Sequence, residues 1–134
     1  MTGRNCARTS TSRQNRLSVH ELRIASENGD VRAIAALLDP SVEMVTDGGG
    51  KVAADARLVR GPTAIAQRIC DVLEQQPAQI SEREVNGVPG LVLTRQGRVA
   101  AVVCVSVRRR RITDLWVVLN PDKLRHWNRP STDL

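Results

Sequence analysis

The sequence contains no Phe and no Tyr, and two Trp are its only aromatic residues. Single-stranded nucleic acid binding through stacked aromatic side chains is therefore not expected. The core must instead be built from Val, Leu, Ile and Ala. A chain of 134 residues is long enough for one domain with a sizeable core.

Cysteine and histidine are also scarce. Cys6, Cys70 and Cys104 are far apart and odd in number, so they predict neither a disulfide framework nor a zinc site. Cys70 and Cys104 lie among apolar residues and are expected to act as small core residues. His20 and His126 have no spacing typical of metal ligands, so we expect no metal and no cofactor.

Long apolar runs are absent as well. No stretch approaches the roughly 20 residues of a membrane span, and the N-terminus lacks the apolar segment of a signal peptide. The sequence therefore predicts a cytoplasmic protein without a membrane partner.

Positive charge is plentiful but unevenly placed. Of the formal +6, the first 17 residues contribute +4, with four Arg and no acid, and residues 108–111 are four consecutive Arg. Arg supplies 18 of the 20 basic residues, which suits phosphate or carboxylate recognition but could equally reflect compositional bias. No DNA-binding motif accompanies this charge, so we expect non-specific nucleic acid contact at most.

The N-terminal half predicts helices. Residues 1–17 are polar and without periodicity, which favours a disordered or loosely helical tail. Ser18 and Glu21 form a capping box, and Gly29 is expected to end that helix. Asp30 then caps a second helix that Pro40 ends.

The remainder alternates between strands and turns. Val42–Asp47 predicts a strand, 52–59 a weaker one, and Pro62 the start of a third helix with one apolar face. Turns at Asn86-Gly87, Gln96-Gly97 and 108–111 separate four further strands, at 80–85, 91–94, 99–107 and 112–119. The strand at 99–107 is almost wholly apolar, so burial on both faces is expected.

Helices early in the chain and strands late in it predict an α+β fold. We expect a cone-shaped, curved antiparallel or mixed sheet wrapped on three helices, with a pocket at its open end. The domain would span residues 18–126, between a basic tail at 1–17 and a C-terminal tail at 127–134.

Two polar stretches stand out, each at the end of a predicted strand. Residues 45–51 read VTDGGGK and residues 119–124 read LNPDKL. Three consecutive glycines suit close backbone approach, positive φ angles or mobility rather than a strand or helix interior. Both stretches carry an Asp and a Lys, which indicates either a contact surface or a mobile connection.

These stretches and four others resemble a known family. The others are Gly29-Asp30, Leu37-Leu38, Val59–Gly61 and Val85–Val92 (VNGVPGLV). Together they are similar to the SnoaL-like group of the nuclear transport factor 2-like superfamily. More narrowly, residues 18–126 resemble the C-terminal extension of one group of extracytoplasmic-function sigma factors.

The resemblance implies a non-catalytic regulatory domain that contacts the sigma core and RNA polymerase. Carried over to this chain, the partner contacts would be Asp47, Gly48, Gly49, Gly50, Lys51, Asn120, Pro121, Asp122 and Lys123. Only about 17 residues precede the domain, so it is expected to be a stand-alone relative, a fragment of a longer chain, or a partner in trans of a sigma factor or polymerase. A homodimer through the exposed sheet face is also expected for this fold.

The alternative is a small-molecule enzyme of the SnoaL, ketosteroid isomerase or epoxide hydrolase type. Such enzymes need a carboxylate or His in an apolar pocket, where desolvation raises a carboxyl pKa. Asp114 is the leading candidate for a general base, because it alternates with Ile112, Trp116 and Val118 and would share a face with them. It could equally be solvated or paired with an Arg of 108–111. The remaining candidates are His20, Asp47, Asp55 and Glu84.

Overall fold

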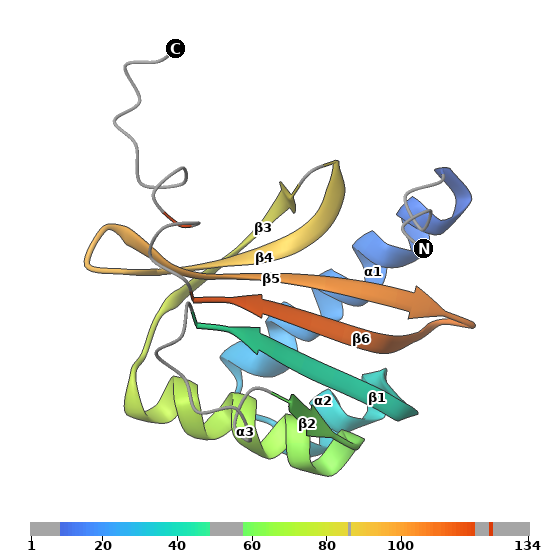
Figure 1. The fold of residues 1–134 in the computed structure, drawn as a ribbon, viewed down its shortest axis with the longest axis horizontal. Helices are drawn as coiled ribbons and strands as arrows, with labels where there is room; N and C mark the ends of the chain where they lie inside the picture. Colours follow the sequence, from blue (N-terminus) through green and yellow to red (C-terminus); the bar gives the residue numbers. More distant parts are fainter. Residues whose placement is uncertain (1–8, 49–57, 86, 120–123, 125–134) are drawn as a thin grey trace.

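The computed structural model describes residues 9–48, 58–85, 87–119 and 124, with side chains described from Arg13 onward (Figure 1). The elements follow the predicted order of two helices, two strands, one helix and four strands. They are α1 (Thr9–Glu27), α2 (Val31–Leu37), β1 (Leu38–Asp47), β2 (Leu58–Arg60), α3 (Pro62–Gln75), β3 (Gln79–Val85), β4 (Val88–Arg95), β5 (Arg98–Arg108) and β6 (Arg111–Val118).

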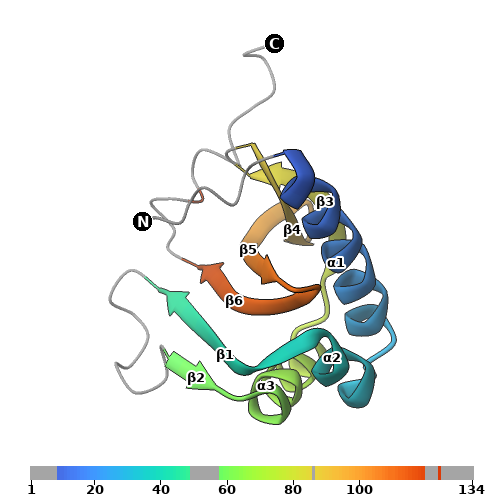
Figure 2. The same cartoon turned by 90° about the vertical axis from the view of Figure 1, so that its right-hand side faces the viewer.

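The six strands form one curved, mixed sheet in the order β2-β1-β6-β5-β4-β3. All neighbours pair antiparallel except β1 and β6, which run parallel. Figure 2 shows the sheet curling around the three helices, which lie on its inner side. The predicted α+β cone is therefore confirmed.

Helix α1 begins at Thr9, so the predicted start at Ser18 was wrong and residues 9–17 are helical. Asn15, Ser18, Val19 and Leu22 are buried on one face of the helix, at the three- and four-residue spacing of a helical stripe. The first half of this stripe is polar, and for that reason the apolar pattern did not reveal it.

The other two helices begin where the sequence predicts. Asp30 caps α2, and its Oδ1 accepts a hydrogen bond from the backbone N of Ala33 at 3.1 Å. Pro62 is the first residue of α3, where its missing N–H costs nothing. Strand β1 starts at Leu38 and includes Pro40, so it is longer than the predicted Val42–Asp47. The predicted strand at 52–59 is seen only as the short β2, since residues 49–57 lie outside the described part.

Two of the predicted hairpin turns are confirmed. Gln96 and Gly97 join β4 to β5, both at positive φ. Arg109 and Arg110 join β5 to β6 with φ of 53° and 68°. Two-residue hairpin turns require positive φ at both positions and usually use Asn or Gly, so this pair of arginines is held in a conformation that side chains disfavour. For the predicted turn at Asn86-Gly87, Asn86 lies outside the described residues.

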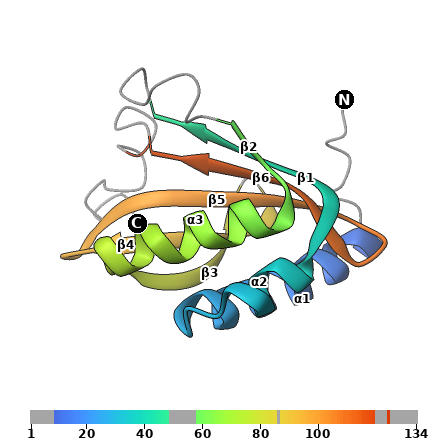
Figure 3. The ribbon, with the colours of Figure 1, turned by 90° about the horizontal axis from the view of Figure 1, so that it is seen from below.

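Apolar side chains fill the two ends of the cone unequally. We call one end the closed end, where α2, the start of α3 and the starts of β1 and β6 meet. Five aliphatic side chains there are at most 1% exposed, namely Ile34, Leu38, Val42, Ile65 and Ile112. Figure 3 shows α2 and the start of α3 covering this part of the sheet. The opposite end, where β1 and β6 finish, is the open end.

The outer face of the sheet carries a second, smaller core. Val85, Val92 and Val102 are buried there against Leu124. Because residues of β5 also belong to the inner core, the strand is buried on both faces, as predicted.

Candidate functional site

A cavity of about 260 Å³ occupies the open half of the cone, between α3, the C-terminal half of α1 and the inner face of the sheet. Leu22, Leu91 and Leu115 at its floor are at most 3% exposed. Val72 and Leu119 at its rim are 40% and 38% exposed. The cavity therefore opens to solvent between α3 and the ends of β1 and β6.

The lining is apolar with a small polar component. Of the 17 described residues that line the cavity, 13 are apolar and the others are Ser26, Thr46, Arg68 and Arg95. Within this described lining the two arginines supply the only charges, and there is no Asp, Glu or His. Such a lining suits an apolar molecule, and none of its described side chains exchanges a proton near neutral pH.

The two arginines reach the cavity from different elements. Arg95 ends β4, and its Nε donates to the backbone oxygen of Gln76 at 3.2 Å. Gln76 is the C-cap residue of α3, where the helix dipole favours a cation. Arg68 lies on α3 and is exposed, and it makes no hydrogen bond or ion pair within the described residues.

The ends of β1 and β6 lie side by side at the open end. Asp47 pairs with Val118 in the parallel register, and the backbone N of Leu119 donates to the oxygen of Asp47 at 2.8 Å. The two polar stretches singled out in the sequence therefore leave the sheet from neighbouring strands. Thr46 and Leu119, next to those ends, also line the cavity. We call the ends of β1 and β6, at Asp47 and Leu119, together with the polar stretches that follow them in the sequence, the docking end, after the contact role that the sequence predicts for them.

Of the predicted contact residues, the structure describes Asp47, which is half-buried, and Gly48, which is buried. The other seven lie outside the described residues: Gly49, Gly50, Lys51, Asn120, Pro121, Asp122 and Lys123. Their contact role stays a prediction.

Asp114 lies outside the cavity. The predicted common face with Ile112 was wrong, because a register shift opposite Ser106 and Val107 in β5 leaves Thr113 as an extra residue in β6. A bulge of this kind reverses the alternation of side chains. Ile112 is fully buried, whereas Asp114 is exposed and accepts a hydrogen bond from Thr113 Oγ1 at 3.0 Å.

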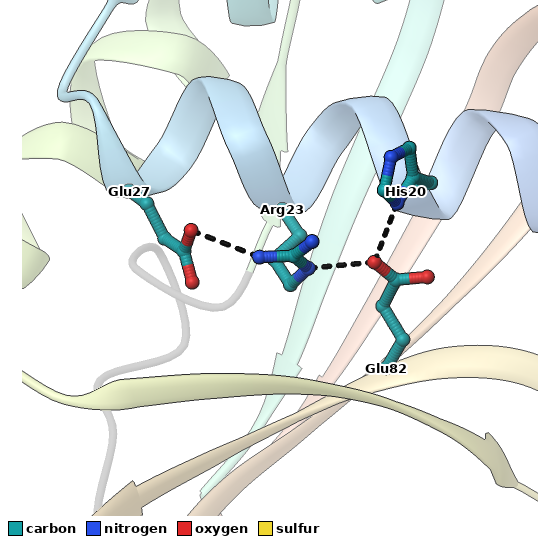
Figure 4. A network of polar contacts seen from close by, with 4 residues as sticks. All are labelled: His20, Arg23, Glu27 and Glu82. Atoms are coloured by element: carbon teal, nitrogen blue, oxygen red, sulfur yellow. Dashed lines mark hydrogen bonds and ion pairs between the residues drawn. The ribbon is translucent and has the colours of Figure 1, made fainter.

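Asp47, Glu84 and His20 are not among the described residues that line the cavity either. Glu84 is exposed on β3, and Asp55 lies outside the described residues. His20 Nδ1 and Arg23 Nε both contact Glu82 Oε2, at 2.8 and 2.6 Å (Figure 4). Burial tends to raise the pKa of Glu82, but hydrogen bonds from Arg23 and His20 outweigh it and lower the pKa. This network ties α1 to β3 on the surface.

The cysteines behave as small core residues, as predicted. Cys70 packs against the inner core and Cys104 against the outer one. Burial raises the pKa of both thiols, which disfavours the reactive thiolate. Within the described residues no group of His, Cys, Asp and Glu could hold a metal ion, and no helix is long and apolar enough to cross a membrane.

Sequence reasoning missed Arg68 and Arg95. Arg68 interrupts the apolar face of α3 between Ile65 and Ile69, and Arg95 directly precedes a turn. In the sequence, each of these arginines is at a position typical of a solvated charge. Only the curvature of the sheet brings both arginines to one cavity.

The curved six-stranded sheet over three helices is the fold of the nuclear transport factor 2-like proteins. One such protein, from Mesorhizobium loti, matches with a TM-score of 0.62 at 13% sequence identity, covering 84% of this chain and 96% of that one. An epoxide hydrolase of the LEH-like type from Mycobacterium tuberculosis matches with a TM-score of 0.54 at 14% identity, covering 87% and 90%. At these identities the likeness concerns the fold alone.

The structure is also similar to the extracytoplasmic function sigma factor SigJ of Mycobacterium tuberculosis. The TM-score is 0.65 at 25% sequence identity, and the match covers 87% of this chain and 46% of that sigma factor. This chain therefore spans less than half the length of SigJ. No protein-family model matches the sequence, and no curated protein sequence does.

Proposed function

We propose that this domain is a non-catalytic regulatory module that contacts a sigma factor or RNA polymerase in trans. The observation that carries the proposal is the parallel pairing of β1 with β6, joined by the Leu119–Asp47 hydrogen bond of 2.8 Å. This pairing starts both polar stretches from one edge of the molecule. A partner could therefore engage both stretches at once.

The chemistry of the two stretches fits a protein partner. Together they offer two Asp and two Lys, and interspersed charges of both signs favour specific orientation over general attraction. The likeness to SigJ adds support, since it covers most of this chain. That a partner binds here, and that it is a sigma factor or polymerase, are the proposal.

An enzyme of the isomerase or hydrolase type is the second candidate, favoured by the epoxide hydrolase among the similar structures. The cavity argues against it. Within the described lining residues no carboxylate or imidazole is present, and both reaction types need a group that takes or gives a proton. Asp114, the leading candidate, is exposed elsewhere.

The test is direct binding to purified RNA polymerase core enzyme and to extracytoplasmic-function sigma factors of the source organism, measured by biolayer interferometry. The domain is expected to bind one of them saturably. Asp47→Ala combined with Asp122→Ala is expected to weaken binding about tenfold or more, as the loss of a paired interface charge does.

Asp114→Ala is the matched control, because it removes an exposed carboxylate from the same sheet without touching the docking end. Binding by this variant should equal that of the wild type. The proposal fails if the wild type binds neither partner, or if the docking-end and control variants lose affinity equally.

A further inference from the structure

The docking role proposed above does not require the cavity. An engineered cavity of about 150 Å³ holds benzene, which has six heavy atoms. The 260 Å³ observed here therefore has room for about ten heavy atoms on the same scale. That is the size of a medium-length hydrocarbon chain alone, so a head group would lie at the mouth, beyond this volume.

The floor of the cavity is suited to the hydrocarbon part of such a molecule. This floor is apolar, with Leu22, Leu91 and Leu115 almost fully buried. Ordered water is disfavoured there because it would find few polar partners. A hydrocarbon tail can occupy this floor.

Two arginine side chains make the described lining of the cavity positively charged. Arg68 and Arg95 are both in the lining, and no described acidic residue lies there to neutralise them. The contact of Arg95 Nε with the Gln76 oxygen uses one donor, and its other guanidinium nitrogens make no hydrogen bond within the described residues. Guanidinium groups bind carboxylate and phosphate groups with paired hydrogen bonds.

We propose that the cavity binds an amphipathic anion, with its hydrocarbon tail of about eight to ten carbons among the apolar residues and its anionic head at the guanidinium group of Arg95, while Arg68 adds positive charge to the same cavity. This binding is independent of the docking proposal, because it requires no protein partner. The shared chemistry is an anionic head on an apolar tail, and the head is either a carboxylate or a phosphate monoester.

Calorimetric titration of the whole protein tests the proposal with a matched set of probes. Decanoate or decyl phosphate is expected to bind at least about tenfold more tightly than decanol, which has the same tail without the charge, since a hydrogen bond to a charged group contributes that much. Decyltrimethylammonium and acetate are expected not to bind. The tighter of the two anions identifies the head group.

Variants locate the site. Arg95→Gln is expected to weaken decanoate binding about tenfold, Arg68→Gln somewhat less because Arg68 is more exposed, and Arg95→Lys less than Arg95→Gln because the charge remains. Arg98→Gln is the control. It removes an arginine that pairs with Arg95 across the β4–β5 hairpin but does not line the cavity, and it should bind like the wild type.

A wild-type measurement complements the variants. On addition of decanoate, methyl resonances of Val72 and Val117, which line the cavity, should shift, and those of Val92 and Val102 on the outer face should not.

Ala101→Leu, which fills the cavity from its wall, should abolish binding. Equal affinity for decanol and decanoate, shifts confined to the outer face, or no saturable binding of either anion would each overturn the proposal.

Discussion

The two ends of the cone are built from the same kinds of residues but differ in how completely those residues fill space. At the closed end the aliphatic side chains of α2, α3, β1 and β6 leave almost no accessible surface. At the open end the same sheet and the same helix α3 leave a cavity. The tightest packing is therefore concentrated at one end, and the other end keeps a cavity.

The largest expected effect comes from truncating the closed end. Ile112→Ala should lower the free energy of unfolding by about 2–5 kcal/mol, because the packed surroundings cannot collapse into the space. Val72→Ala, at the cavity rim, should cost less than about 1 kcal/mol, since its side chain is 40% exposed. Urea denaturation of both variants measures the contrast, and similar losses would show that the two ends do not differ.

A glycine in β4 should be nearly as sensitive. A Cβ at Gly90 would lie 2.6 Å from the backbone oxygen of Val103 and 3.0 Å from Val85 Cγ2. Gly90→Ala is therefore expected to destabilise the protein by about 1–3 kcal/mol through overpacking. Thermal unfolding measures this effect, with the exposed Thr63→Ala as the control. Wild-type stability for Gly90→Ala would mean that β4 and β5 separate easily.

Asn15 is a polar residue on the buried face of α1, where most of the surrounding core is apolar. It is fully buried, and neither its side-chain oxygen nor its side-chain nitrogen has a hydrogen-bond partner among the described residues. Asn15→Leu should raise the free energy of unfolding by about 1–2 kcal/mol, because an unsatisfied buried amide is costly. Chemical denaturation is the measurement. A loss of stability would indicate that the amide has a role that the folded chain alone does not reveal.

The smallest effect is expected outside both ends, in the network around Glu82. Its pKa is lowered in the folded state, so the ionised carboxylate stabilises the fold above the pKa of the unfolded chain. That contribution is lost as the pH falls through the folded-state pKa. Glu82→Gln should therefore cost less than about 1 kcal/mol at pH 7, and this loss should shrink as the pH falls through the folded-state pKa. A loss that does not change with pH would exclude ionisation as the cause.

Much of the fold was predictable because its signals are local. Asp30 at a helix start, Pro62 in a first turn and Gly97 in a hairpin each impose a conformation on their neighbours. The start of α1 was missed because its buried face carries Asn15 and Ser18 rather than apolar residues. The common face of Asp114 with Ile112 was wrongly predicted, because one extra residue in β6 reverses the alternation.

The cavity was beyond sequence reasoning for another reason. Arg68 and Arg95 are 27 positions apart, and nothing in either segment indicates that they share a cavity. That the two polar stretches begin at the same edge of the sheet was easier to anticipate, since both follow strands. Even so, the adjacency of their starting points depends on the parallel pairing of β1 with β6, which local patterns do not specify.

That pairing also has a consequence for how the chain is made. Strand β1 emerges early in synthesis, but its neighbour β6 is the last strand to appear. Until then β1 and β5 each present an unsatisfied edge that can pair with another chain. Products that end before Arg111 would keep both edges open, so premature termination would yield aggregates rather than a smaller working domain.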